Sequence, residues 1–143
     1  MSELRLPAEL KFAAELAALE ATDDALRPPQ WRLSPRAVET YVMGSAKPIG
    51  GVAITPKYYG DRALVQVAIA TLASDRALML AGEPGTAKSW LSEHLSAAIC
   101  GTSLLTVQGT ACTSEDHLKY GWNYALLIAE GPSERALVPS PVM

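Results

Sequence analysis

Apolar residues recur at helical spacing in four stretches of the chain, which run from Leu6 to Asp24, Ser34 to Val42, Asp61 to Ala73 and Lys88 to Cys100. Positions three and four apart lie on one face of a helix, so each stretch predicts a helix with one buried side. In the first helix this side comprises Leu10, Ala13, Ala14, Ala17 and Ala21. In the last two helices it comprises Leu64, Val65, Ala68, Ile69 and Leu72, and then Leu91, Leu95, Ala98 and Ile99.

Capping and turn residues set the expected limits of these helices. Ser34 followed by Pro35 is typical of an N-cap with proline at the first helical position. Pro28-Pro29 forbids continuation of the preceding helix, and Gly101 stands where a glycine commonly ends one. Gly44 to Gly60 is rich in glycine and proline and predicts a loop.

Two apolar runs lack helical spacing and predict strands. Ala77 to Ala81 is apolar without alternation, which favours a strand buried on both faces at the centre of a parallel sheet. Leu104 to Val107 predicts a second strand. The pattern therefore predicts an α/β fold, a parallel sheet with flanking helices, preceded by a helical N-terminal segment.

The first run leads into a match to the phosphate-loop pattern G-x-x-x-x-G-K-[ST], formed by Gly82, Glu83, Pro84, Gly85, Thr86, Ala87, Lys88 and Ser89. Alanine stands in place of the second glycine. Main-chain N–H groups of such a loop converge on nucleotide phosphates, and the following helix adds its positive N-terminal end. Because Pro84 has no N–H, we expect the donors to come from residues 85 to 90, ending at Trp90. Lys88 is expected to contact the β- and γ-phosphates, and Ser89 to bind Mg²⁺.

A chance match within an ordinary strand–turn–helix is the alternative to nucleotide binding. The pattern is loose, but here a buried-type strand precedes it and an amphipathic helix follows it. This context favours the phosphate-loop interpretation.

The loop before the third helix ends in Tyr58-Tyr59-Gly60-Asp61. A loop in this place can close over a purine base, which gives Tyr59 and Gly60 a base-side role. A plain turn with aromatic packing explains them equally well. His94 and His117 stand apart from other ligand-type residues and are expected to be packing or surface residues. Trp31 is expected to anchor the core.

Composition excludes several classes of protein. The chain has 143 residues, of which 49% are hydrophobic and 19% charged, and this balance argues against disorder. A net charge of −3 gives no basic surface for nucleic acid. Cys100 and Cys112 lack neighbours at zinc spacing and are expected to be reduced thiols. No stretch approaches the ~20 apolar residues of a membrane span, and no signal peptide is evident, so a cytoplasmic protein is expected.

An ATP hydrolase also needs acidic residues at the end of a second buried strand. Ala125 to Glu130 imitates such a strand, but it supplies one acid and a Gly-Pro turn follows. A surface glutamate beside a turn is the simpler interpretation of Glu130.

The phosphate loop, together with Tyr59-Gly60-Asp61 one helix upstream, resembles the start of an AAA+ ATPase domain. Alanine before the lysine is similar to the MoxR-like, dynein-related branch, and Leu137 to Val142 resembles the proline-bounded segment ahead of that branch's Walker B strand. The resemblance implies an incomplete P-loop NTPase fold, ATP, Mg²⁺, and a homo-oligomeric ring that remodels proteins, often beside a von Willebrand A-type partner. Walker B, sensor and arginine-finger residues are expected beyond residue 143, as in a truncated portion of a longer ATPase.

Residues 1–50 are accordingly expected to form a helical N-terminal segment, and residues 51–143 the N-terminal part of the ATPase domain. Two other functions stay open from the residues alone. One is a small P-loop kinase, for which only Arg135 is available as a lid arginine. The other is a non-catalytic interaction module that nucleotide merely orders.

Overall fold

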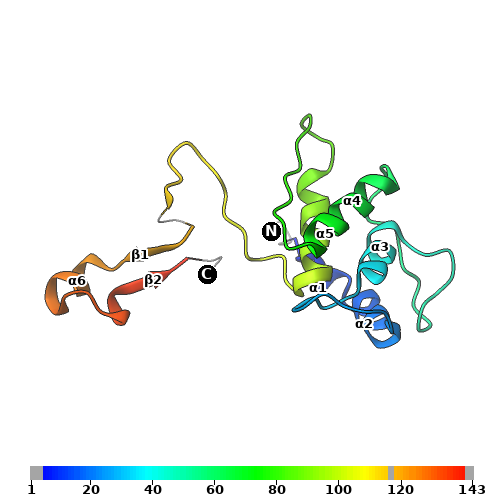
Figure 1. Ribbon diagram of the computed structural model, residues 1–143, viewed down its shortest axis with the longest axis horizontal. Coiled ribbons are helices and arrows are strands. Elements are labelled where there is room, and N and C mark those ends of the chain that lie inside the picture. The colour runs from blue at the N-terminus through cyan, green and yellow to red at the C-terminus, as the bar shows by residue number, and fades with distance from the viewer. Residues whose placement is uncertain (1–4, 116–117, 141–143) are drawn as a thin grey trace. The chain divides into compact units, whose positions relative to one another are not determined.

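The computed structural model describes residues 5–115 and 118–140 (Figure 1). The elements up to residue 100 are α1 (Ala8–Lys11), α2 (Ala13–Thr22), α3 (Pro35–Met43), α4 (Arg62–Ala73) and α5 (Lys88–Cys100). They are followed by β1 (Tyr120–Trp122), α6 (Tyr124–Glu130), the 3₁₀ helix η2 (Glu134–Ala136) and β2 (Leu137–Pro139). The chain divides into two compact units, one up to Ser103 and one from Leu104 onward. The domain boundary expected at residue 50 stays a prediction.

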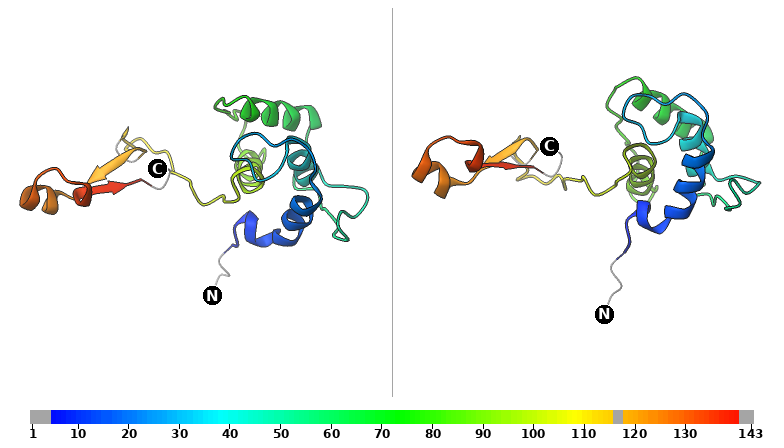
Figure 2. Two further views of the ribbon diagram at one scale, coloured as in Figure 1. Left: turned by 60° about the horizontal axis from the view of Figure 1, so that its bottom comes forward. Right: turned by 90° about the horizontal axis from the view of Figure 1, so that it is seen from below.

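The first unit is a cluster of helices around α3. Helix α3 contacts α2, α4 and α5, while α1 contacts α2 and α5, and Figure 2 shows this arrangement from two further sides. The core is built from buried apolar side chains of all these helices except α1, together with Leu33 and Ile54 from connecting segments. Leu16, Val38, Tyr41 and Val65 are fully enclosed there.

The structure has two helices where the sequence predicted one over Leu6 to Asp24. The prediction of which face is buried is also wrong. Phe12, at φ −113° and ψ 27°, separates α1 from α2. The buried side of α2 comprises Glu15, Leu16, Ala18 and Leu19, whereas Leu10, Ala13, Ala14, Ala17 and Ala21 are exposed. Two leucines remove more apolar area from water than a stripe of alanines, so they turn α2 toward the core.

The other three predicted helices are confirmed, but Leu64, expected on the buried side of α4, is 42% exposed. Ser34 caps α3, with its Oγ accepting the N–H of Ala37 at 3.2 Å. Asp61 caps α4 in the same way, through the N–H of Ala63 at 2.9 Å. Gly101 ends α5 in the left-handed conformation, at φ 79°. All four residues expected on the inner face of α5 are buried, namely Leu91, Leu95, Ala98 and Ile99.

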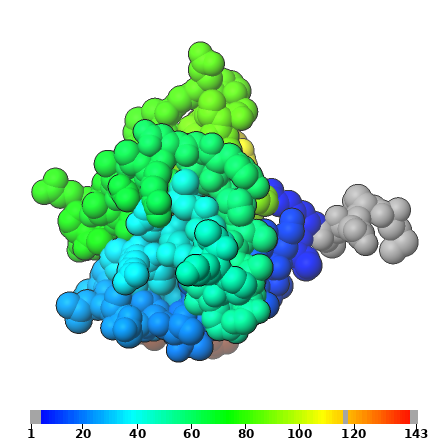
Figure 3. All heavy atoms as spheres, turned by 90° about the vertical axis from the view of Figure 1, so that its right-hand side faces the viewer, coloured from blue at the N-terminus to red at the C-terminus, as the bar shows by residue number. Residues whose placement is uncertain are grey.

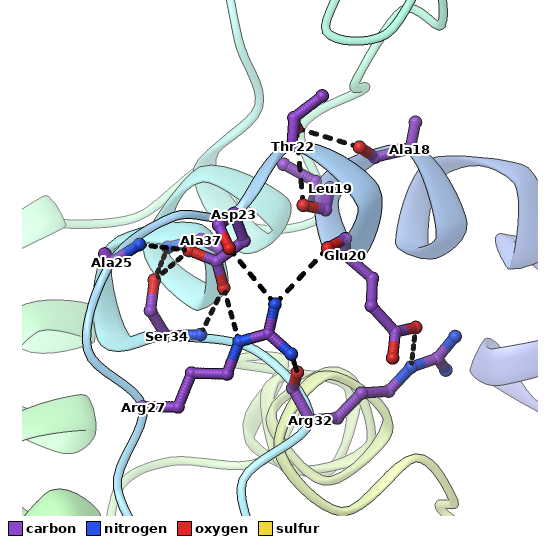
Figure 4. Close-up of polar contacts among 10 residues, drawn as sticks. All are labelled: Ala18, Leu19, Glu20, Thr22, Asp23, Ala25, Arg27, Arg32, Ser34 and Ala37. Carbon is purple, nitrogen blue, oxygen red and sulfur yellow. Dashed lines mark hydrogen bonds and ion pairs between the residues drawn. The ribbon is translucent and has the colours of Figure 1, made fainter.

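Asp23, at the C-terminal end of α2, also holds the start of α3 (Figure 4). Its carboxylate accepts the N–H and the hydroxyl of Ser34, each at 2.7 Å, and forms an ion pair with Arg27 at 3.3 Å. Burial acts to raise the pKa of Asp23, but the bonds from Ser34 and the charge of Arg27 outweigh it, so the pKa is lowered. Arg27 and Arg32 extend the network to main-chain oxygens and to Glu20.

Replacing Ser34 by alanine is expected to lower the free energy of unfolding by about 1 kcal/mol, because the N-cap and one Asp23 contact are lost together. Chemical denaturation measures this change. Thr40→Ala is the matched control: its hydroxyl is exposed within α3 and donates to the carbonyl of Arg36, its one hydrogen-bond partner in the part of the chain described. We expect that control to change stability by less than about 0.5 kcal/mol. Equal effects of the two substitutions would contradict the role given to Ser34.

The predicted loop from Gly44 to Gly60 is a loop, and it packs on α3. The N–H of Ser45 donates to the carbonyl of Ile54 at 3.0 Å, and the N–H of Lys57 donates to that of Val42 at 2.8 Å. Ile54 is 2% exposed. In the space-filling view of Figure 3 this loop (blue-green) lies directly against α3 (cyan). The loop therefore has a fixed path.

Neither predicted run is a strand in this structure, since the strands of the described residues are β1 and β2, which lie later in the chain. Within Ala77 to Ala81, Leu78 and Leu80 pack against the core, but Met79 is 86% exposed. Leu104 and Leu105 are 68% and 62% exposed. A strand exists only where a second strand completes its hydrogen-bond ladder, and apolar composition cannot supply that partner.

The second unit is a small antiparallel pair carrying a helix. Strand β1 pairs with β2 in the register Tyr120↔Pro139 and Trp122↔Leu137, and α6 and η2 connect them. Ala125 to Glu130, which imitates a buried strand in sequence, is thus helical. His117 and residues 141–142, which carry sequence-based predictions, lie outside the described residues. Among the described residues, no helix has the length and apolar character to cross a membrane.

Candidate functional site

The segment between α4 and α5 forms the loop that precedes the first turn of α5 (Figure 1, green). Gly82, Gly85 and Ala87 have φ values of 155°, 82° and 58°. Glycine reaches positive φ without strain, so the two glycines suit this path. Helix α5 begins at Lys88, directly after Ala87.

Ala87, the N-cap residue of α5, adopts the left-handed conformation. For a residue with a Cβ this conformation costs about 1–2 kcal/mol. The glycine of the usual pattern has no such cost. Alanine is accommodated here, at φ 58° and ψ 23°, but under backbone strain.

The amine of Lys88 lies over the loop. Nζ donates to the carbonyl of Gly82 at 2.9 Å and to Thr86 Oγ1 at 3.0 Å, and it also bonds to the carbonyl of Glu83. Thr86 Oγ1 in turn donates to the Glu83 carbonyl at 2.9 Å. The charge is therefore held at the mouth of the loop by neutral acceptors, which an anion can replace.

The main-chain N–H groups from Gly85 to Trp90 have no hydrogen-bond acceptor among the described residues. Apart from Lys88 and Trp90, which are half-buried, these residues are exposed. Unpaired N–H groups at a helix N-terminus carry its partial positive charge. These donors and the Lys88 amine fit the phosphates of a nucleotide, and Ser89 at the second position of α5 is exposed.

Tyr59 and Gly60 lie in the loop before α4, and the structure shows no hydrogen bond from them to residues 82–89 among the residues described. Tyr59 is 87% exposed. The ring of Tyr58 covers Gly60 so closely that a Cβ there would overlap it. A hydrogen bond next to these residues does connect the loop before α4 with the start of α5. The indole Nε1 of Trp90 donates to the carbonyl of Lys57 at 2.7 Å.

Lys57 forms a buried ion pair with Glu15, which sequence reasoning missed. The Lys57 side chain is 1% exposed and that of Glu15 is 11% exposed. Glu15 also accepts the hydroxyl and the N–H of Thr55, at 2.9 and 3.1 Å. Burial lowers the pKa of Lys57 even though the Glu15 carboxylate opposes this change. The spacing of Leu16 and Leu19 is the one signal that could have placed Glu15 on the inner face.

His94, in the second turn of α5, lies at the centre of an aromatic cluster formed with Phe12, Tyr41 and Trp90. It is fully buried, and its Nδ1 is 3.0 Å from the Tyr41 hydroxyl oxygen. The Trp90 ring is 4.5 Å away. Burial, together with the charges of Lys57, Arg5 and Lys11, lowers the pKa of His94 to about 4. The structure thus confirms a packing histidine.

Glu130 does not resemble a residue that activates water. It is the last residue of α6, exposed, and forms an ion pair with Arg135 at 3.5 Å. This agrees with the simpler interpretation of Glu130 as a surface glutamate beside a turn.

Comparisons with known proteins connect this loop to a family. Residues 77–143 match the model of the AAA domain, dynein-related subfamily. The chain is also 51% identical over 138 residues to the uncharacterized protein YehL of Escherichia coli (strain K12). That alignment covers 96% of this chain and 37% of YehL. No solved structure matches the chain.

The family match begins at the apolar run before the phosphate loop and includes the whole loop and α5. It confirms the family that the loop sequence resembles. Residues 77–143 therefore belong to an AAA domain of the dynein-related subfamily.

Proposed function

We propose that this chain binds ATP with Mg²⁺ through residues 82–89, as the nucleotide-binding portion of a MoxR-like AAA+ ATPase. The observation that carries the proposal is that the N–H groups from Gly85 to Trp90 have no acceptor among the described residues, while the Lys88 amine lies over the same loop. This set lies inside the segment that matches the AAA family.

Each residue of the loop has a distinct part in this proposal. The N–H groups of residues 85–90 bind phosphate oxygens, and Lys88 exchanges its bonds to the loop carbonyls for bonds to the β- and γ-phosphates. Ser89 supplies the hydroxyl ligand of Mg²⁺, which neutralises phosphate charge when bound. Gly82 supplies the backbone conformation of the loop, at φ 155°, whereas a Cβ there would make only ordinary contact with Lys88, 3.9 Å from Nζ. The proposal places Tyr59 and Gly60 on the base side.

The proposal covers binding by this chain and extends to the longer protein only by resemblance. The chain spans 37% of the length of YehL. Assembly into a ring, remodelling of partner proteins, a von Willebrand A-type partner and a cytoplasmic location are parts of the proposal that rest on the family. The parallel sheet is also part of the proposal and rests on the family. In such a sheet, residues 77–81 would form the central strand by pairing with neighbouring strands. Hydrolysis is not assigned to Glu130, given its place at the end of α6.

No observation favours a kinase. Its one candidate lid arginine, Arg135, is paired with Glu130. The other alternative, a non-catalytic module that is ordered by nucleotide, also requires that this loop binds ATP. A binding experiment therefore tests both the proposal and this alternative.

Replacing Lys88 by alanine is expected to weaken ATP binding at least tenfold, about 1.4 kcal/mol, because the only side-chain cation of the loop is removed. Isothermal titration calorimetry with Mg²⁺ present measures the change. Lys47→Ala is the matched control, since Lys47 is exposed in the loop before α4 and lies outside the site. Equal ATP affinity of the Lys88 variant and the unmodified protein would refute the site.

A further inference from the structure

One hydrogen bond links the two segments that the proposed function places at opposite ends of ATP. Trp90 directly follows Ser89 in the first turn of α5, and Lys57 stands two residues before Tyr59. The indole Nε1 donates to the Lys57 carbonyl at 2.7 Å, across 33 positions of sequence. The Trp90 side chain therefore joins the phosphate side to the base-side loop.

Both ends of this bond are fixed by packing. Lys57 donates its main-chain N–H to Val42 in α3, and its amine to Glu15 in α2 and to the Thr55 carbonyl at 2.6 Å. The amine also lies 4.4 Å from the centre of the Tyr41 ring. On the other side, the Trp90 ring packs edge-on against His94. Neither partner can shift without disturbing the core.

Beyond Lys57 the loop is shaped to present one exposed aromatic ring. Tyr58 packs against the core and covers Gly60, while Tyr59 is 87% exposed. A side chain other than hydrogen at position 60 would displace Tyr58. The path of the chain from Lys57 to Gly60 thus follows from where the Lys57 carbonyl is held.

We propose that the indole N–H of Trp90 is a positioning group that holds the base-side loop at a fixed place relative to the phosphate loop. A ligand that contacts both segments then binds without ordering the loop first, which improves its affinity. A ligand that contacts only the phosphate loop gains nothing from this bond. The inference rests on the proposed function and predicts a preference for ATP over inorganic tripolyphosphate that depends on Trp90.

Trp90→Phe tests this dependence, because it keeps an aromatic ring beside His94 and the main-chain N–H but removes the indole donor. We expect the dissociation constant of ATP to rise about fivefold, the order expected for one net hydrogen bond, and that of tripolyphosphate to change less than twofold. Calorimetry on the whole protein measures both ligands. Trp31→Phe is the matched control, since Trp31 is also a half-buried tryptophan packed on the core. It should leave the ratio of the two affinities unchanged.

Hydrogen exchange of the Trp90 indole N–H in the unmodified protein provides a second measurement that needs no substitution. By reciprocity, ATP should slow this exchange more than tripolyphosphate does, with the indoles of Trp31 and Trp122 as internal references. Equal slowing by the two ligands, or equal losses of both affinities in Trp90→Phe, overturns the inference. If Lys88→Ala changes neither affinity, the proposed function itself fails, which is a distinct result.

Discussion

Replacing Lys57 by methionine is expected to lower the free energy of unfolding by about 3 kcal/mol at pH 7. The substitution keeps most of the side-chain volume but leaves the Glu15 carboxylate buried without its cation, next to the hydroxyl and N–H of Thr55. Removing one partner of a buried ion pair costs about 3–5 kcal/mol, and the slight exposure of Glu15 places the estimate at the lower end. Urea denaturation followed by circular dichroism measures the loss.

Two further variants separate the buried charge from other effects of the substitution. Arg62→Met breaks an exposed ion pair, in which Arg62 Nε lies 2.6 Å from Glu39 and the Arg62 side chain is 65% exposed. It should cost less than about 1 kcal/mol. The double variant Glu15→Gln with Lys57→Met should be more stable than Lys57→Met alone, because no charge is then left unpaired. A double variant less stable than the single one would show that the charge is not the cause.

Lowering the pH from 7 to 5 is expected to remove about 2 kcal/mol of stability through His94. Its pKa is about 4 in the folded protein, against 6.5 in an unfolded chain. Between these values the unfolded chain binds more protons, so the contribution is complete above pH 6.5 and is lost as the pH falls toward 4. Protonation is disfavoured because the ring is buried near the cations Lys57, Arg5 and Lys11, and the Glu15 carboxylate only partly offsets them.

The matched control for this pH dependence is His94→Gln, whose amide can still bond to the Tyr41 hydroxyl but does not titrate. Denaturation at pH 7 and pH 5 should show a stability loss that is smaller in the variant by about 2 kcal/mol. The comparison stops at pH 5 because three carboxyl groups with lowered pKa values titrate at more acid pH, namely Glu9, Asp23 and Glu39. Identical dependence of stability on pH in the two proteins would show that His94 is not the titrating group.

Local signals predicted the helices well where a cap and a stripe of large apolar residues agreed. Ser34-Pro35 and Asp61 begin α3 and α4, and the spacing of Leu91 and Leu95 gave the inner face of α5. The α2 prediction failed because alanines at helical spacing form a stripe on any face, while two leucines decide which face is buried. Strand predictions failed for another reason, since residues 77–81 have no partner strand among the described residues.

The sequence alone determined the phosphate-loop pattern and its family, because tight turns, a lysine and a hydroxyl must follow one another at fixed spacing to surround phosphates. Only the tertiary structure decided which buried polar contacts support that loop. The Glu15–Lys57 pair and the bond from Trp90 to Lys57 join residues 42 and 33 positions apart. Such contacts leave no periodic trace, because they depend on how helices pack and on which polar groups are buried together, and neither is a local property of the chain.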